Sequence, residues 1–529
     1  MTSTDEFTYD TVPYTSFPYA QTHPDQLCTI GRLFGMSPAH PTFCRVLELG
    51  CAAGGNLLPM AEQLPGSEFV GIDLSQRQIE EGRENIEKLG ISNLRLVHAD
   101  ILEPEQAFGM FDYIICHGVY SWVSREIQDR ILSICRDHLN PHGIGYISYN
   151  TYPGWHLRES VRRMFRYHAS RFSTPEERVA ASRELLDFLV NQLKGSEEPY
   201  ALMLDKEFMI LRDRGDDYLF HEHLESVNAP CYFNEFAEHI EEFDLQYLGD
   251  ADLSSMLGRE MTEEARKTVD RITSDIIQME QYFDFLRNRQ FRMSLVCRNS
   301  IPLKRTLDGT SVKDLRFLLQ PSEKPDPVVL NSTKEHLFKT GLNRTIRTGT
   351  PLMKAALEYL MEQWPNSVDM NHLHTAVKSR MEAVGITIPP EEDIKGEIGT
   401  GLLQITGTGG VSLRSWEPPF ATEAGHRPTI RPSSRLTARR YLFCTNAHHE
   451  RCSLSPAVAQ LVMLLDGKHD RPALLEAMLV QAQNRVFSIT VDGNAAIDKE
   501  ALRMPLNEFI DNTLEKFARL LLLGPDGLG

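Results

Sequence analysis

The sequence predicts an α/β protein whose N-terminal part is a doubly wound, mostly parallel sheet and whose remaining domains are largely helical. Three observations support this prediction. Apolar segments of strand length alternate with helical segments between residues 46 and 149. A glycine-rich turn follows the first of these strands, and acidic residues follow the first three. This alternation is typical of βαβ units in a parallel sheet.

The first predicted strand, Val46–Leu49, leads into the turn Gly50–Asn56, after which a helix begins. Backbone N–H groups in such a turn can approach a ligand closely, because few side chains stand in the way. Asp73 ends the next strand and Asp100 the third. Any one of these acids could simply be a solvated strand end. Together they favour a nucleoside ligand at the carboxyl edge of the sheet.

Two nucleoside ligands are compatible with this turn. A dinucleotide fingerprint matches at Gly50, Ala52 and Gly55, with Asp73 as the ribose ligand. Glu48 and Gly54 complete a Glu-x-Gly-x-Ala-x-Gly pattern, which resembles the nucleoside-binding loop of class I S-adenosylmethionine (SAM) methyltransferases, with Ala52 replacing a glycine. A carboxylate suits a cationic sulfonium nucleoside and would repel a pyrophosphate. The pattern therefore favours a methyltransferase over a nicotinamide enzyme.

The resemblance implies roles for particular residues. The acid at the position of Asp73 holds the ribose hydroxyls, and the acid at the position of Asp100 holds the adenine amino group, with Ile101 against the ring. The segment after the fourth strand, from His117, lies along bound SAM. The residues assigned to the cofactor on this basis are Tyr14, Glu48, Gly50, Ala52, Gly54, Asn56, Asp73, Leu74, Asp100, Ile101, His117, Gly118 and Tyr120.

Later elements complete the predicted sheet. Phe111–His117 is a continuous apolar run of the kind buried in parallel sheets, and a helix is expected from Glu126 to His138. Pro141–Gly143 then turns into a fifth strand, Ile144–Tyr149.

The segment Tyr149–Trp155 begins where that fifth strand ends, which is where ligands bind in this architecture. Methylation of a lysine requires an uncharged amine, so aromatic walls and hydrogen-bond acceptors suit the acceptor channel. The candidate acceptor residues are Tyr149, Asn150, Tyr152 and Trp155. The alternative is a Pro-Gly turn anchored by aromatic side chains. Tyr120 and Trp122 either line the same channel or serve only in packing.

Charge and cysteine content restrict the class of protein. The formal charge of −18 disfavours nucleic acid and favours cationic substrates. The nine cysteines include no Cys-x-x-Cys pair, which indicates reduced thiols. Neither a signal peptide nor a membrane-spanning run is evident, so we expect a cytoplasmic protein without membrane insertion. His221-Glu-His223 and His448-His449 lack a third metal ligand, and no metal is predicted.

We expect five regions along the chain. Residues 1–40 form an aromatic, proline-containing arm that either closes over the cofactor or covers a sheet edge. The SAM domain spans 41–170, and a helical regulatory or dimerisation region spans 171–330, with a capping box at Thr174–Glu177. A middle domain follows at 331–420, and a C-terminal domain at 421–529.

The middle domain is predicted to be winged-helix-like, with helices followed by a hairpin of 402–406 and 411–416. Between 351 and 420 it has five Lys/Arg and nine Asp/Glu residues, which argues against a nucleic-acid surface. The basic run from Arg427 to Arg440 either pairs with the chain's own acids or binds an acidic partner.

Taken together, several short segments resemble one bacterial family, the methyltransferases that carry a methyltransferase regulatory domain, including rickettsial protein lysine methyltransferases that modify outer-membrane protein. The matching segments are 14–19, 22–24, 47–60, 149–155, 220–225, 281–292, 431–439 and 464–467. The resemblance implies a C-terminal domain that shapes a protein-substrate cleft. It also implies a protein substrate, with an outer-membrane protein and a homodimer as options.

The predicted function is therefore SAM-dependent methyl transfer to a protein side chain, with the lysine amine favoured and S-adenosylhomocysteine (SAH) as the product. One alternative is a small-molecule methyltransferase whose extra domains serve as lid and dimer interface. A second is a non-catalytic SAM-binding interaction protein. A nicotinamide enzyme is a third.

Overall fold

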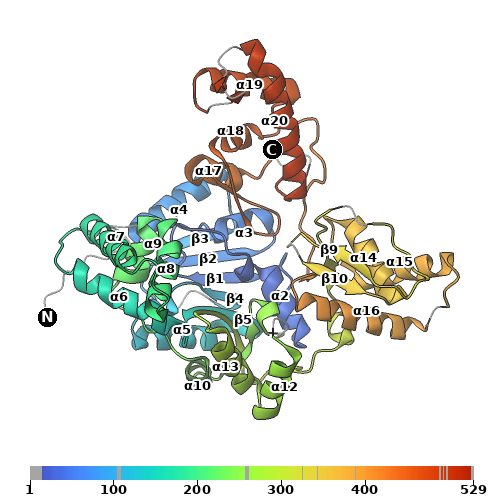
Figure 1. Cartoon of the computed structure of the whole chain (residues 1–529), viewed down its shortest axis with the longest axis horizontal. Helices are drawn as coiled ribbons and strands as arrows, with labels where there is room; N and C mark the ends of the chain where they lie inside the picture. Colours follow the sequence, from blue (N-terminus) through green and yellow to red (C-terminus); the bar gives the residue numbers. More distant parts are fainter. Residues whose placement is uncertain are drawn as a thin grey trace.

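A seven-stranded sheet forms the centre of the computed structural model (Figure 1). The structure describes residues 15–103, 109–256, 261–323, 326–341, 344–387, 389–487, 490–491, 494–495 and 499–525. The strands of the central sheet are β1 (Arg45–Leu49), β2 (Glu68–Asp73), β3 (Leu94–His98), β4 (Phe111–Cys116), β5 (Leu139–Asn150), β6 (Leu245–Asp250) and β7 (Phe291–Arg298).

The strand order is β3-β2-β1-β4-β5-β7-β6, with β7 antiparallel to both of its neighbours and the first five strands parallel. This confirms the predicted doubly wound sheet. The last two strands come from residues 245–298, which the sequence analysis assigned to the helical region. Strand β7 joins the sheet through long-range pairing with β5, and β6 pairs with β7; local patterns do not reveal these contacts.

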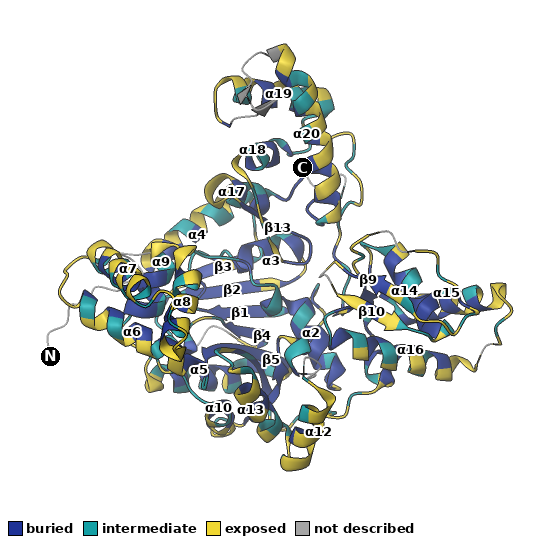
Figure 2. Ribbon diagram, in the orientation of Figure 1, coloured by how far each residue is buried: buried dark blue, intermediate teal, exposed yellow. Residues whose placement is uncertain are grey.

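Helices cover both faces of this sheet (Figure 2). Val46 packs into the cluster that includes α2 (Pro24–Leu33), α3 (Leu57–Gln63) and α4 (Gln76–Leu89). Its neighbour Leu47 packs on the opposite side. The helices of that second face include α5 (Arg125–His138), α10 (Phe233–Glu241) and α13 (Ile276–Arg287). Successive residues of β1 thus serve opposite cores, which is why both faces of the central strands carry apolar residues.

A helical layer follows β5 in sequence and lies to the left in Figure 1. Its first helix begins at Trp155, and the Thr174 capping box predicted from the sequence starts the second. A short π-helical turn, Phe220–Leu224, ends the layer and packs against α6 and α9. The four helices are α6 (Trp155–Ala169), α7 (Pro175–Gln192), α8 (Pro199–Arg212) and α9 (Asp216–Leu219). Two further helices, α11 (Leu253–Met256) and α12 (Glu263–Ile272), precede α13.

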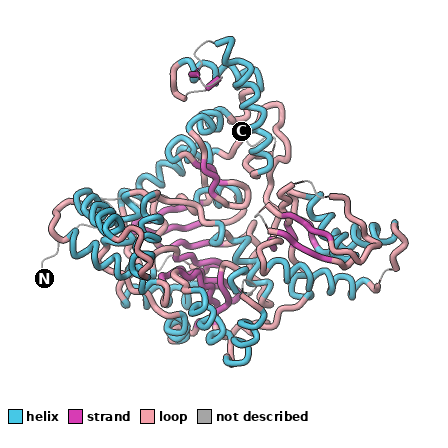
Figure 3. The backbone as a smooth tube through the Cα atoms, in the orientation of Figure 1, coloured by secondary structure: helices cyan, strands magenta, loops and turns pink. Residues whose placement is uncertain are grey.

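The middle domain differs from the expected hairpin (Figure 3). Residues 402–406 are the last turns of α16 (Glu391–Thr406), and β12 (Ser412–Arg414) pairs with β8 (Arg316–Leu318) instead. The hairpin prediction was wrong because Leu402 and Leu403 lie on the buried side of a helix, and a short apolar run of this kind does not distinguish a helix from a strand. The domain also contains α14 (Pro351–Gln363), α15 (Met370–Ala383), β9 (His336–Lys339), β10 (Thr345–Thr348) and β11 (Val368–Asp369).

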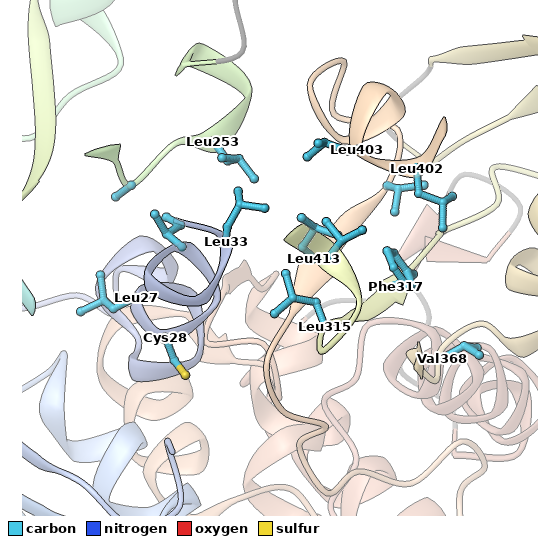
Figure 4. Packing of buried hydrophobic residues seen from close by; sticks show 14 of the residues in the cluster. Leu27, Cys28, Leu33, Leu253, Leu315, Phe317, Val368, Leu402, Leu403 and Leu413 are labelled. Carbon is cyan, nitrogen blue, oxygen red and sulfur yellow. The ribbon is translucent and has the colours of Figure 1, made fainter. Parts of the chain in front are cut away.

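Helix α2 joins the sheet to this middle domain. Leu27, Cys28 and Leu33 of α2 belong to the same buried cluster as Phe317 and Leu413 (Figure 4). The buried carboxylate of Asp25 accepts hydrogen bonds from the backbone N–H groups of residues 415 and 416 at 2.8 and 3.0 Å, and from Nη1 of Arg414 at 3.1 Å. One short helix therefore packs against two domains.

The C-terminal domain has its own core and rests on α3 and α4. Arg440 pairs with Glu81 of α4, and the Arg431 guanidinium donates to the carbonyl of Pro419 at 2.9 Å. These two members of the basic run bind inside the chain. The domain comprises α17 (Pro432–Tyr441), β13 (Phe443–Thr445), β14 (Arg451–Ser453), α18 (Pro456–Leu464), α19 (Arg471–Gln483), β15 (Thr490–Val491), β16 (Asn494–Ala495) and α20 (Lys499–Arg519). Across the described residues, every helix is too short or too polar to span a bilayer.

Replacing Asp25 by alanine tests the junction at α2. The change leaves Arg414 and two backbone donors without their buried acceptor, so we expect a loss of roughly 3 kcal/mol and a clearly lower midpoint of thermal unfolding. Asp213→Ala is the matched control, because Asp213 pairs with Arg212 on the surface. Equal midpoints for the two variants would contradict this account.

Candidate functional site

A cavity of about 570 Å³ opens at the carboxyl edge of the sheet. Its wall is formed by the glycine turn, the ends of β2 and β4, the N-terminal segment 15–19, and the helical layer. Most of the residues singled out from the sequence line it. These are Glu48, Gly50, Ala52, Asn56, Asp73, Leu74, Asp100, Ile101, His117, Gly118, Asn150 and Trp155.

Other predicted site residues point elsewhere. The Tyr149 ring stacks on Phe236 at 4.3 Å, because adjacent residues of β5 face opposite sides and Asn150 takes the cavity side. Tyr152 stacks on His156 at 3.9 Å, outside the cavity lining. The hydroxyl of Tyr120 bonds to His239. Gly54 faces Leu96, and Tyr14 lies outside the described residues. Tyr149 and Tyr152 therefore do not line this cavity, and their acceptor role stays a prediction.

Gly50 and Ala52 of the glycine turn adopt a left-handed backbone conformation. Gly50 has φ +75°, and a Cβ there would lie 2.5 Å from Val119 Cγ2. Ala52 also has a positive φ of 49°, a conformation that costs a non-glycine residue roughly 1 kcal/mol. Its N–H donates to Asp73 Oδ2 at 2.7 Å, and the Ser75 N–H donates to Oδ1 at 2.8 Å. The backbone thus holds the Asp73 carboxylate in one orientation.

Glu48 is a buried acid whose two carboxylate oxygens differ in their hydrogen bonding. Its Oε1 accepts from Asn56 Nδ2 at 2.8 Å, whereas Oε2 has no hydrogen-bond partner within the described part of the chain. Burial raises the pKa of Glu48 to about 8, the Asn56 amide opposes the rise, and Asp73 adds to it. A cationic or hydrogen-bond-donating ligand at Oε2 would stabilise the ionised form of Glu48.

The Asn56 side chain connects Glu48 to two distant segments. Its Oδ1 accepts from the backbone N–H of Tyr19 at 3.0 Å and from Nε2 of His449 at 2.9 Å. Its Nδ2 donates to Thr22 Oγ1 at 3.0 Å as well as to Glu48. Burial lowers the pKa of His449 well below its usual value, so the neutral ring donates this bond. The C-terminal domain thereby contacts the cavity acid through a single amide.

The N-terminal segment forms part of the cavity wall. Ser16 Oγ accepts from the N–H of Gly55 at 2.8 Å, and the ring of Tyr19 lies 3.8 Å from that of His117. Arg451 of the C-terminal domain stacks on Phe17, 4.4 Å from its ring centre. Residues 15–19 therefore cover the turn and do not extend along a sheet edge.

The two histidine pairs have protein partners. His221 Nδ1 lies 3.0 Å from Glu225, and His223 Nε2 lies 3.3 Å from Glu207. His449 bonds to Asn56, as described above. Among the described residues no three His, Cys, Asp or Glu side chains form a metal-binding group.

Sequence reasoning missed part of the lining. Thr15 and Ser16 of the N-terminal segment, Arg158 of α6 and Tyr218 of α9 all face the cavity. So do Glu222, Gln290 and Phe291, whereas Trp122, for which the sequence left lining or packing open, also lines the cavity. The signal for some of them was present, because the family-like segments 220–225 and 281–292 include or adjoin these positions. No local sequence pattern indicates that these residues lie beside the glycine turn, which precedes Glu222 by some 170 residues.

Comparisons with known proteins agree with this geometry. Residues 46–143 match the family model of a methyltransferase domain, and residues 215–298 match the "Predicted methyltransferase regulatory domain". Residues 426–522 match "PKMT, C-terminal winged helix domain". A winged helix was expected in the middle domain, and the comparison assigns one to the C-terminal domain.

The full-length likeness is to rickettsial proteins. Uncharacterized protein RP789 of Rickettsia prowazekii is 34% identical, with 99% of this chain and 94% of that protein covered. The structure of PKMT2 from Rickettsia typhi in complex with AdoHcy superposes with a TM-score of 0.84, at 30% identity over 97% of this chain and 100% of PKMT2.

A sheet of this order with acids at its carboxyl edge, together with the matched domain, defines a SAM-dependent methyltransferase. The chain belongs to the family that includes RP789 and PKMT2, in which a regulatory domain and a C-terminal winged helix follow the methyltransferase domain.

His449→Ala tests the link between the C-terminal domain and the cavity. Loss of one hydrogen bond to Asn56 lets the amide, and with it Glu48, take other orientations, so we expect the affinity for SAH to fall roughly fivefold, or about 1 kcal/mol. Isothermal titration calorimetry measures the change. His426→Ala, at an exposed position of the same domain, serves as the control. An unchanged affinity in His449→Ala would show that the bond does not support the site.

Proposed function

We propose that this protein transfers a methyl group from SAM to the side-chain amine of lysine in a protein. The full-length likeness to PKMT2 is the observation that carries this proposal. The cavity supports it, because one open space extends from the glycine turn to Asn150, Trp155 and the helical layer. A cofactor and a long, narrow side chain can therefore share it.

The donor-binding part of the cavity fits SAM. The unpaired Oε2 of Glu48 suits the positively charged part of the donor, and the oriented Asp73 carboxylate suits the ribose hydroxyls. Asp100 and Ile101 are proposed to hold the adenine, and His117 and Gly118 to lie along the donor. When bound, SAM supplies an activated methyl group to a neutral nucleophile. The protein's task is to orient the two reactants and exclude water.

Two further features belong to the proposal. A protein substrate fits the strongly negative chain, whose charge of −18 attracts lysine-rich surfaces. We propose a cytoplasmic location, with an outer-membrane protein before export as one substrate and a homodimer as one assembly.

Incubation of the purified protein with methyl-labelled SAM and a whole-cell lysate tests the function. Label in protein bands, located on lysine by mass spectrometry, supports protein methylation. Label confined to small molecules would favour a small-molecule methyltransferase. Saturable SAM binding with no transfer to any fraction would indicate a non-catalytic binding protein.

Asp73→Ala tests the proposed ribose contact. It removes the carboxylate that two backbone N–H groups orient, so we expect SAH affinity to fall by roughly tenfold or more. Calorimetry measures the affinity, and circular dichroism confirms that the variant folds. Glu84→Ala is the control, because this exposed acid on α4 pairs with Lys88 on the surface. If Asp73→Ala binds SAH as the unaltered protein does, the assignment is wrong.

The raised pKa of Glu48 predicts a pH dependence of donor binding. Below about 8 the free protein holds Glu48 protonated, and a cationic ligand favours the carboxylate, so binding releases a proton. Affinity for SAM should rise between pH 6 and 7.5, by up to roughly tenfold per pH unit. Calorimetry in buffers of different ionisation heat counts the proton released. Glu48→Gln should abolish the release, and proton uptake by the unaltered protein would contradict the prediction.

A further inference from the structure

Arg158 is the centre of a charged cluster in the part of the cavity wall formed by the helical layer. Its Nε and Nη2 both donate to Glu207 Oε1, at 3.2 and 3.1 Å, and Nη2 also donates to the hydroxyl of Tyr218 at 3.2 Å. The Arg158 and Glu207 side chains are only 10% and 7% accessible. The positive charge of Arg158 is therefore already matched by a buried partner.

Glu222 is the second carboxylate beside Arg158. Its Oε2 lies 3.6 Å from Arg158 Nη1, too far for a hydrogen bond, and among the described residues no hydrogen bond to its carboxylate is seen. Its side chain is 20% accessible and lines the cavity. Glu222 thus keeps its hydrogen-bonding capacity available to a molecule in that space.

Titratable groups of both signs surround Glu222. Helix α6 contributes Arg158 and Arg162, α8 contributes Glu207, α9 contributes Tyr218, and the π-helical turn contributes His221, His223 and Glu225. Burial lowers the pKa of His223 and raises that of Tyr218, which keeps both neutral. Two guanidinium groups and the His221 ring, which lies 3.0 Å from Glu225, then face three carboxylates, counting Glu222. Because none of these groups hydrogen-bonds to the Glu222 carboxylate, a bound cation would supply its missing partner.

We propose that Glu222 binds the ammonium group of the acceptor lysine and removes its proton. This inference rests on the proposed function and names the group that prepares the nucleophile. One N–H bond of the ammonium breaks, the proton moves to a carboxylate oxygen of Glu222, and the electron pair stays on nitrogen. The amine so formed is the uncharged nucleophile that methyl transfer requires. Glu222 then releases its proton to water before the next turnover.

The electrostatics of the cavity agree with this role. Burial raises the pKa of Glu222, which Arg158 partly opposes and Glu207 reinforces, and this makes the carboxylate a stronger base. Burial and the charges of Glu48 and Glu222 raise the pKa of Tyr19 to about 12, against the opposing effect of Arg451. Tyr19, Glu48 and Glu222 all line the same cavity, so the proposed acceptor acid and the proposed donor-binding acid share one space.

Binding of n-butylammonium, a mimic of the lysine side chain, to the full-length protein saturated with SAH tests the proposal. Calorimetry or ligand line broadening in proton NMR measures its affinity. We expect Glu222→Gln to weaken this binding by roughly tenfold or more and Glu222→Asp to weaken it less. SAH affinity should not change, and n-butanol should not compete. With a lysine peptide, Glu222→Gln should also flatten the rise of kcat with pH.

Glu159→Gln is the matched control, because Glu159 lies on α6 and pairs with Arg163 without lining the cavity. Equal n-butylammonium affinity in Glu222→Gln and the unaltered protein would overturn the proposal. Loss of SAH affinity in Glu222→Gln would also overturn the proposal, because Glu222 would then contribute to binding of the methyl donor and not of the acceptor. If Glu222→Gln does not fold, the unaltered protein provides the test. Its affinity for n-butylammonium would then have to change between pH 5 and 8, and a constant affinity would overturn the proposal.

The proposed lysine methylation and the proposed role of Glu222 can be refuted independently of each other. Cation binding that depends on Glu222, combined with no labelled protein from labelled SAM, would refute lysine methylation and leave the cation site in place. Labelled lysine with full activity in Glu222→Gln would refute only the role of Glu222.

Discussion

The side-chain amide of Asn56 holds the site together. One end donates to Glu48 and Thr22, and the other accepts from the Tyr19 backbone and from His449. Glu48 is the cavity acid, Tyr19 belongs to the N-terminal segment, and His449 to the C-terminal domain. Because these groups are buried, an unsatisfied member is costly, so the bonds favour one arrangement of all three. The position of the C-terminal domain is thereby coupled to the orientation of a single carboxylate.

Buried or half-buried acids with incomplete hydrogen bonding are the second feature of the cavity. Glu48 leaves one buried oxygen unpaired, and Glu222 lies beside an arginine that already has a closer partner. Folding alone does not favour either arrangement, because buried carboxylates without partners destabilise the native state. Both are understandable if two cations, a sulfonium nucleoside and an ammonium group, occupy the cavity together. Binding site and reaction chemistry then follow from the same charges.

Much of the donor region could be predicted from the sequence. Glu48, Gly50, Asp73 and Asp100 occur at regular places in a strand-turn-helix pattern, and the structure brings them to one cavity. The acceptor region was predicted less well. Tyr149 is one residue from Asn150, yet its side chain packs on the other face of the sheet, because successive side chains of a strand point to opposite faces. The prediction named both residues, and of the two only Asn150 lines the cavity.

The sequence by itself determined the doubly wound sheet, its glycine turn and the acids at its edge, because these depend on hydrophobic periodicity and on local backbone geometry. Only the tertiary structure decided that β6 and β7 complete the sheet, that residues 402–406 are helical, and that His449 and Glu222 reach the cavity. Those contacts join residues that are far apart in the chain. Their formation depends on how whole domains pack, and no local pattern encodes that.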